Sequence, residues 1–98
     1  MTTEPDARTL IRDFVAARTV ISHGIAVLTR RDTLILLRFL RRYPVKNMGI
    51  DALKLLNGGY IQPDMEHDYD LDQIPFDDAI RAIEGLDDVY HFEWYTGP

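Results

Sequence analysis

The stretch RDTLILLRFLRRY, residues 31 to 43, carries the strongest signal for the fold of this chain. Asp32 is suited to cap a helix, and Pro44 directly after Tyr43 would end it. At about 100° per residue, apolar side chains cover most of the circumference of such a helix, and arginines share the remaining arc. The pattern predicts a helix near the centre of the core, with one basic stripe at the surface formed by Arg31, Arg38, Arg41 and Arg42.

The sequence before this helix predicts another helix and one ambiguous segment. Thr3 and Pro5 form a helix-start pattern, and an apolar stripe at helical spacing extends to Ile21 before Gly24 ends it. The next segment, Ile25–Thr29, fits either a strand or more helix, because so short an apolar run has no decisive periodicity.

The sequence after the central helix predicts a third, shorter helix. Asn47 can cap it, and Ile50, Leu53 and Leu56 recur at the spacing of an inward helical face. We therefore expect a helix over Gly49–Leu56.

The C-terminal part predicts two strands, a loop and a fourth helix. Five acids at alternate positions would repel one another on one strand face, so Asp64–Gln73 is expected to be a solvated loop. Pro75 and Gly85 suit the two ends of a helix. The expected elements are a short strand at Tyr60–Ile61, a helix over Pro75–Leu86 and a strand over Val89–Tyr95 with one aromatic face. The expected core residues are Leu37, Phe39, Leu40, Ile80, Ile83 and Phe92.

Together these elements predict one α+β domain over residues 1–98, mostly helical, with about four helices and a small sheet of two or three strands. The element order resembles a winged helix, with the last three expected helices as its tri-helical part and Val89–Tyr95 as a wing strand. That resemblance would make Pro75–Leu86 the DNA-reading helix. Asp77, Asp78 and Glu84 outnumber Arg81 there, so phosphates would repel it.

Composition sets the class of protein. The 98 residues contain no cysteine, which excludes disulfides and thiolate metal sites and fits a cytoplasmic protein. The N-terminus is acidic and polar, unlike a signal peptide, and the longest apolar runs of four or five residues are far too short to span a membrane.

No residue pattern in the chain predicts catalysis or a bound metal. Asp68, Asp70 and Asp72 have the opening spacing of an EF-hand, but Gln73 stands where that loop needs glycine and Ala79 where it needs glutamate. The single serine, Ser22, has no predicted catalytic partner, and no phosphate-binding glycine loop is present. We therefore predict a non-enzymatic protein without cofactor, catalytic or metal site.

Charge is divided unevenly along the chain. Residues 1–60 hold ten basic and five acidic side chains, whereas residues 61–98 hold one basic and eleven acidic ones. The acidic part predicts a module of the inhibitor, immunity or adaptor type that docks on a basic site of a larger protein. The expected contact residues are Asp64, Glu66, Asp68, Asp70, Asp72, Asp77, Asp78 and Tyr95.

Two alternatives stay open. The arginine stripe suits phosphates, so a nucleic-acid-binding regulator, as a homodimer or a monomer, is the second hypothesis. The stripe would otherwise pair with the acidic loop of this same chain or form a solvated face.

Overall fold

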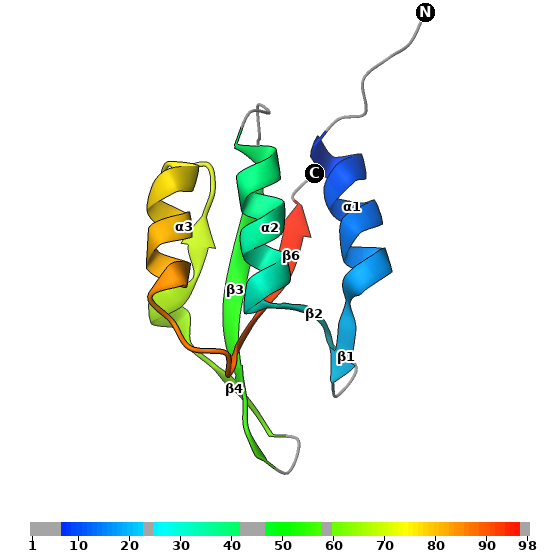
Figure 1. Cartoon of the computed structure of the whole chain (residues 1–98), viewed down its shortest axis with the longest axis vertical. Coiled ribbons are helices and arrows are strands. Elements are labelled where there is room, and N and C mark those ends of the chain that lie inside the picture. The colour runs from blue at the N-terminus through cyan, green and yellow to red at the C-terminus, as the bar shows by residue number, and fades with distance from the viewer. Residues whose placement is uncertain (1–6, 23–24, 42–46, 58–59, 97–98) are drawn as a thin grey trace, which may run out of the picture.

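The computed structural model describes residues 7–22, 25–41, 47–57 and 60–96, which form three α-helices, one 3-10 helix and six strands (Figure 1). In chain order the elements are α1 (Ala7–Arg18), β1 (Val20–Ser22), β2 (Ile25–Thr29), α2 (Arg30–Leu40), β3 (Met48–Leu55), β4 (Ile61–Pro63), the 3-10 helix η2 (Met65–His67), β5 (Tyr69–Asp70), α3 (Phe76–Glu84) and β6 (Tyr90–Thr96).

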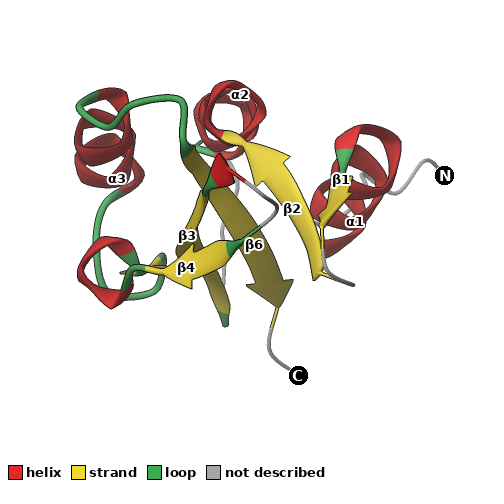
Figure 2. Ribbon diagram, turned by 90° about the horizontal axis from the view of Figure 1, so that it is seen from below, coloured by secondary structure: helices red, strands yellow, loops and turns green. Residues whose placement is uncertain are grey.

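The strands form one antiparallel sheet in the order β1-β2-β6-β3, and β4 and β5 both pair with β3. Figures 1 and 2 show α1, α2 and α3 side by side on one face of this sheet. The prediction of a mostly helical domain with four helices and two or three strands is therefore wrong, because the described residues form three α-helices and a six-stranded sheet. None of the helices in the described part of the chain is long and apolar enough to cross a membrane.

The segment expected as a third helix is instead the central strand of the sheet. β3 runs between β6 on one side and β4 with β5 on the other, so its backbone is paired along both edges. Ile50 and Ala52 are buried toward the helices, whereas Leu56 is 42% exposed. A short apolar run fits the period of a helix as well as that of a strand. Pairing with the long aromatic strand β6 stabilises the strand here.

This correction also removes the winged-helix arrangement, which needs a helix over Gly49–Leu56. Upstream, Ile21 belongs to strand β1 rather than to a helical stripe, and Ile25–Thr29 is a strand paired with β1 and β6. The expected start at Thr3 and cap at Gly24 lie outside the described residues.

Helix α2 begins earlier than the sequence suggested. Thr29 is its cap, and the Thr29 hydroxyl accepts a hydrogen bond of 3.1 Å from the backbone N–H of Asp32. Asp32 thus lies in the first turn, where its charge complements the helix dipole. The helix ends at Leu40, with Arg41 as its cap; Arg42 and Tyr43 lie outside the described residues.

The core lies between the helices and the sheet. Leu37, Leu40, Ile83 and Phe92 are fully buried and Ile80 is 6% exposed, as predicted. Phe39 was expected in the core but is 41% exposed, because α2 buries the side of Leu36, Leu37 and Leu40 and turns Phe39 outward.

Candidate functional site

The register of β3 and β6 decides which residues occupy the sheet face that the α-helices leave uncovered. Opposed residues of an antiparallel pair share a face, and successive residues alternate between faces. The pairs of Ile50 with Trp94 and Ala52 with Phe92 lie toward the helices. The alternate pairs therefore lie on the open face: Gly49 with Tyr95, Asp51 with Glu93, and Leu53 with His91.

Tyr95 lies across Gly49 on this open face. A Cβ atom at position 49 would collide with the phenol ring of Tyr95, so the missing side chain of Gly49 makes room for it. The ring is still 44% exposed. Tyr95 therefore presents an aromatic surface that is held against the backbone of β3.

Acidic side chains surround this ring. The pKa of Tyr95 is raised, first by partial burial and then by the nearby charges of Asp51, Asp70, Asp68 and Asp72. The pKa of Asp51 is also raised, first by burial and then by Asp68 and Glu93. We call this group the Tyr95 surface: Asp51, Asp68, Asp70, Asp72, Glu93 and Tyr95.

The acidic segment between β4 and β5 is attached to β3 by a side chain rather than by a continuous strand. Asp68 Oδ1 accepts a hydrogen bond of 2.8 Å from the backbone N–H of Ala52, and the carbonyl oxygen of Ala52 accepts one of 3.0 Å from the backbone N–H of Asp64. β4 and β5 pair with β3 at either end of this gap. Asp68 thus replaces a missing strand partner of β3.

Asp70 and Asp72 hold the turn that follows β5. Asp70 Oδ1 accepts from the backbone N–H of Asp72 at 2.9 Å, and Asp72 Oδ2 accepts from the backbone N–H of Asn47 at 2.6 Å. Leu71, between them, is 4% exposed and donates its N–H to Met48 O at 2.9 Å. The expected solvated loop over Asp64–Gln73 therefore contains η2, β5 and a bonded turn.

Asp64 and Glu66 belong to a different environment. Asp64 Oδ2 accepts a hydrogen bond of 2.8 Å from the Tyr90 hydroxyl, which lowers the pKa of Asp64 and raises that of Tyr90. Asp64 Oδ1 also accepts from the backbone N–H of Glu66, the first turn of η2. Asp64 is thus a structural anchor, and Glu66 is exposed beside it.

The structure separates Asp77 and Asp78 from the Tyr95 surface. Both lie on α3, in the helical layer, where Asp77 pairs with Arg41 at 3.7 Å and Asp78 with Arg81 at 2.8 Å. The expected acidic set is therefore divided between the sheet and α3.

The arginine stripe contacts the same helix. Arg38 pairs with Glu84 at 3.1 Å, and Arg30, which precedes the stripe, donates to the carbonyl oxygens of Ile83 and Glu84 at 3.1 and 2.8 Å. Arg31 is exposed in the first turn of α2, and Arg42 lies outside the described residues. The pairing of this stripe with acids of the same chain thus involves α3 and not the acidic segment before it.

Sequence reasoning missed Asp51 and Glu93. Both acids lie in segments that the sequence predicts to be regular. Because Asp51 falls in the segment predicted as a helix, the sequence does not indicate that it pairs with Glu93 across two strands. The apolar residues Met48, Ile50 and Ala52 stand at every second position, which is the period of a strand and would have placed Asp51 on the opposite face.

The carboxylates of this surface do not form a metal centre. Within the described ranges, no group of three or more His, Asp or Glu side chains is placed to hold a metal ion. Comparison of the chain with family models, with curated protein sequences and with solved structures finds no match.

Proposed function

We propose that this chain is a non-enzymatic protein-binding module, of the inhibitor, immunity or adaptor type, whose Tyr95 surface docks on a basic site of a larger protein. The observation that carries the proposal is the placement of Asp51 directly opposite Glu93, beside the half-exposed Tyr95, on the uncovered sheet face. The proposal includes a cytoplasmic location, which rests on the cysteine-free sequence.

Energetics support a cationic partner. Like charges directly opposite across two strands destabilise a sheet, and Asp51 is also held above its ordinary pKa by burial and by Asp68 and Glu93. A guanidinium or ammonium group bound between these carboxylates would relieve the repulsion. The isolated chain carries this penalty, and a complex with a basic partner would remove it.

The combination of an aromatic ring with acids suits a protein contact. Tyrosine is enriched among the residues that dominate binding energy at interfaces. Clustered charge of one sign accelerates encounter with a partner of opposite sign. Tyr95 supplies the aromatic ring, and the five carboxylates around it supply the clustered negative charge.

The contacts of the arginine stripe argue against the nucleic-acid alternative. Arg38 and Arg41 each lie within ion-pair distance of an acid on α3. Phosphates approaching the stripe would also meet Asp77 and Glu84, which line the same cleft of about 450 Å³. The stripe is therefore a mixed-charge surface.

The test is affinity capture from a lysate of the native host, with and without nuclease, using three forms of the chain. The first is the wild type, the second carries Asp51→Asn with Glu93→Gln, and the control carries Asp77→Asn with Asp78→Asn. We expect a nuclease-resistant protein with the wild type and the control, and its loss with the second form. Capture unchanged by the sheet substitutions, or recovery of nucleic acid alone, would refute the proposal.

A further inference from the structure

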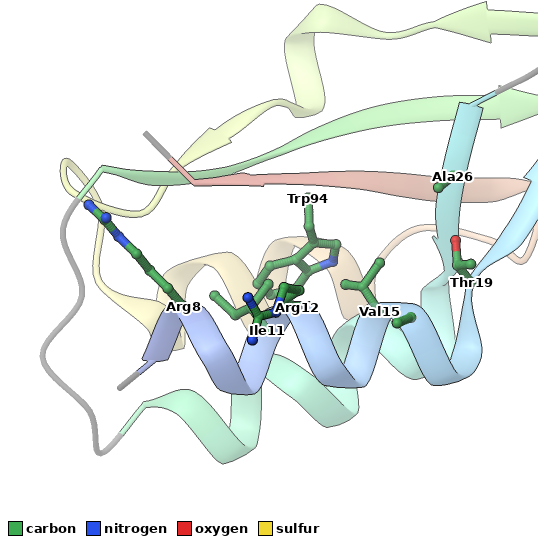
Figure 3. A pocket seen from close by; sticks show the side chains of 8 residues that line it. Arg8, Ile11, Arg12, Val15, Thr19, Ala26 and Trp94 are labelled. Atoms are coloured by element: carbon green, nitrogen blue, oxygen red, sulfur yellow. The ribbon is translucent and has the colours of Figure 1, made fainter. Parts of the chain in front are cut away.

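A cavity of about 370 Å³ lies between α1 and the sheet (Figure 3). Helix α1 forms one wall, and β2 and β6 contribute Ala26 and Trp94 to the other. Its size falls within the range of small-molecule sites. The residues that define it are Arg8, Ile11, Arg12, Val15, Ala26 and Trp94.

The spacing of the lining residues along α1 explains why they form one wall of the cavity. Arg8, Ile11, Arg12 and Val15 stand at positions i, i+3, i+4 and i+7, which places them on one side of a helix, and Thr19 continues this line beyond its end. The cavity therefore runs along α1, and residues 8 and 19 are separated by about 16 Å of helical rise. Figure 3 shows Arg8 at one end and Thr19 at the other. The Thr19 hydroxyl donates to the carbonyl oxygen of Val27 at 3.2 Å, which ties that end to β2.

The opposite wall is open because Ala26 is small. Ala26 remains exposed although its neighbours Val27 and Leu28 are buried. Trp94 projects from β6 toward α1, and its indole N–H donates to the hydroxyl of the fully buried Thr33 at 3.3 Å. This hydrogen bond fixes the indole and uses its donor, so the ring contributes apolar surface to the cavity.

The charged side chains among the described lining residues are both basic. Arg8 and Arg12 lie one helical turn apart, and no carboxylate is among the described lining residues. Arg12 also approaches Asp13 at 3.7 Å, but both side chains are mostly exposed, so this ion pair is weak. The site therefore offers an elongated apolar floor with two guanidinium groups toward one end.

We propose that this cavity binds a free, unbranched aliphatic carboxylate. The alkyl tail lies along Ile11, Val15 and the ring of Trp94, and the carboxylate accepts hydrogen bonds from Arg8 and Arg12. The elongated shape favours a chain over a compact ligand, and the positive charges of Arg8 and Arg12 favour an anion over an alcohol or an amine. The site is independent of the Tyr95 surface, because Trp94 and Tyr95 project from opposite faces of β6.

Trp94 is the only tryptophan of the chain, so its fluorescence reports on this cavity directly. Decanoate and decyltrimethylammonium are titrated below their micelle concentrations and decanol below its solubility limit, with calorimetry as a second measurement. We expect saturable binding of decanoate that shifts Trp94 emission, weaker binding of decanol and weakest binding of the cation. Equal affinity for all three, or no saturable binding of decanoate by either method, would overturn the proposal.

Substitutions separate the head-group contact from the tail contact. Arg8→Gln with Arg12→Gln is expected to weaken decanoate binding about tenfold or more and leave decanol unchanged. The matched control is Arg31→Gln, an exposed arginine on α2 outside the cavity, which should change neither. A loss of decanoate affinity equal in both variants would show a general charge effect and refute the site.

Substitutions that fill the cavity test whether the alkyl tail binds there. Ala26→Leu and, separately, Ala16→Leu, at a second alanine that lines the cavity on α1, should abolish binding of decanoate and decanol alike. Circular dichroism confirms that each variant is folded, and two variants on different elements guard against one failing to fold. The control is Phe39→Ala, which alters the neighbouring apolar groove between α1 and α2. Loss of binding in Phe39→Ala and retention in both leucine variants would place the ligand in that groove and overturn the proposal.

Discussion

Asp51 and Glu93 lie directly opposite each other on β3 and β6, on the sheet face that the α-helices leave uncovered. Opposed like charges weaken a strand pair, and the pKa of Asp51 is raised first by burial and then by the charges of Asp68 and Glu93. A chain selected for stability alone would carry an uncharged residue at one of the two positions. The pair is thus a source of repulsion within the isolated fold, and the proposed contact with a basic partner rests on it.

The first prediction concerns the stability effect of that pair. Asp51→Asn should raise the free energy of unfolding by about 0.2–1 kcal/mol at neutral pH, because it removes the repulsion. The folded pKa of Asp51 is raised above the ordinary value of 3.8, so its ionisation destabilises the fold as pH rises through the folded pKa. Urea denaturation at neutral pH and near pH 3 measures the difference, which should vanish at the acidic value. Asp77→Asn, which breaks the pair with Arg41, should give no gain.

The second prediction concerns Gly49 and Tyr95. Gly49→Ala would force the phenol ring away from β3, because a Cβ there overlaps the ring atoms. Burial is the largest cause of the raised Tyr95 pKa, so displacement should lower that pKa toward the ordinary value of 10.0. Titration by NMR of labelled tyrosine measures it. An unchanged Tyr95 pKa in the folded variant would show that the ring does not lie where we place it.

Part of this fold follows from local sequence and part does not. The helix between Pro75 and Gly85 and the aromatic strand β6 are visible locally, because proline, glycine and a two-residue aromatic alternation are strong signals. β3 is not, because Ile50 and Leu53 fit a helix as well as a strand, and only pairing with β6 decides between them. The acidic surface depends on that decision, since Asp51 meets Glu93 and Asp68 only when residue 51 lies on a strand.

The third prediction concerns the core. Leu37→Ala and Ile83→Ala should each lower the free energy of unfolding by about 2–5 kcal/mol, because both side chains are fully buried between helices and sheet. Phe39→Ala is the comparison, and its effect should be clearly smaller because Phe39 is 41% exposed. Thermal denaturation of the three variants checks the order, and an equal loss at Phe39 would contradict the orientation of α2.

The fourth prediction concerns the hydrogen bond between Tyr90 and Asp64. Tyr90→Phe should lower the thermal midpoint and raise the pKa of Asp64, because the Tyr90 hydroxyl is the main cause of its lowered pKa. A lowered carboxyl pKa stabilises the fold above the unfolded value of 3.8, and this contribution is lost as pH falls through the folded pKa. The stability difference between Tyr90→Phe and the wild type should therefore shrink in acid. A difference independent of pH would assign the effect to packing alone.

The last prediction separates the structural role of the acidic segment from its charge. Asp68→Asn keeps an Oδ1 acceptor for the backbone N–H of Ala52, whereas Asp68→Ala leaves that donor without it. The alanine variant should lose about 1–3 kcal/mol of stability, and the asparagine variant much less. Asp70→Asn and Asp72→Asn likewise keep acceptors for the N–H groups of Asp72 and Asn47. The triple asparagine variant is therefore expected to fold, which makes it a clean test of charge.

In that triple variant, association with the partner captured by the wild-type chain should slow markedly and lose most of its dependence on salt. Electrostatic steering is screened over about 8–10 Å at physiological ionic strength, so salt and charge removal act on the same contribution to the on-rate. Stopped-flow association at low and high salt measures both effects. The comparison variant carries Arg38→Ala and Arg41→Ala, which break the pairs with α3. If that variant abolishes binding while the asparagine variant associates at the wild-type rate, the working surface is the arginine stripe, and the acids around Tyr95 are a feature of the fold alone.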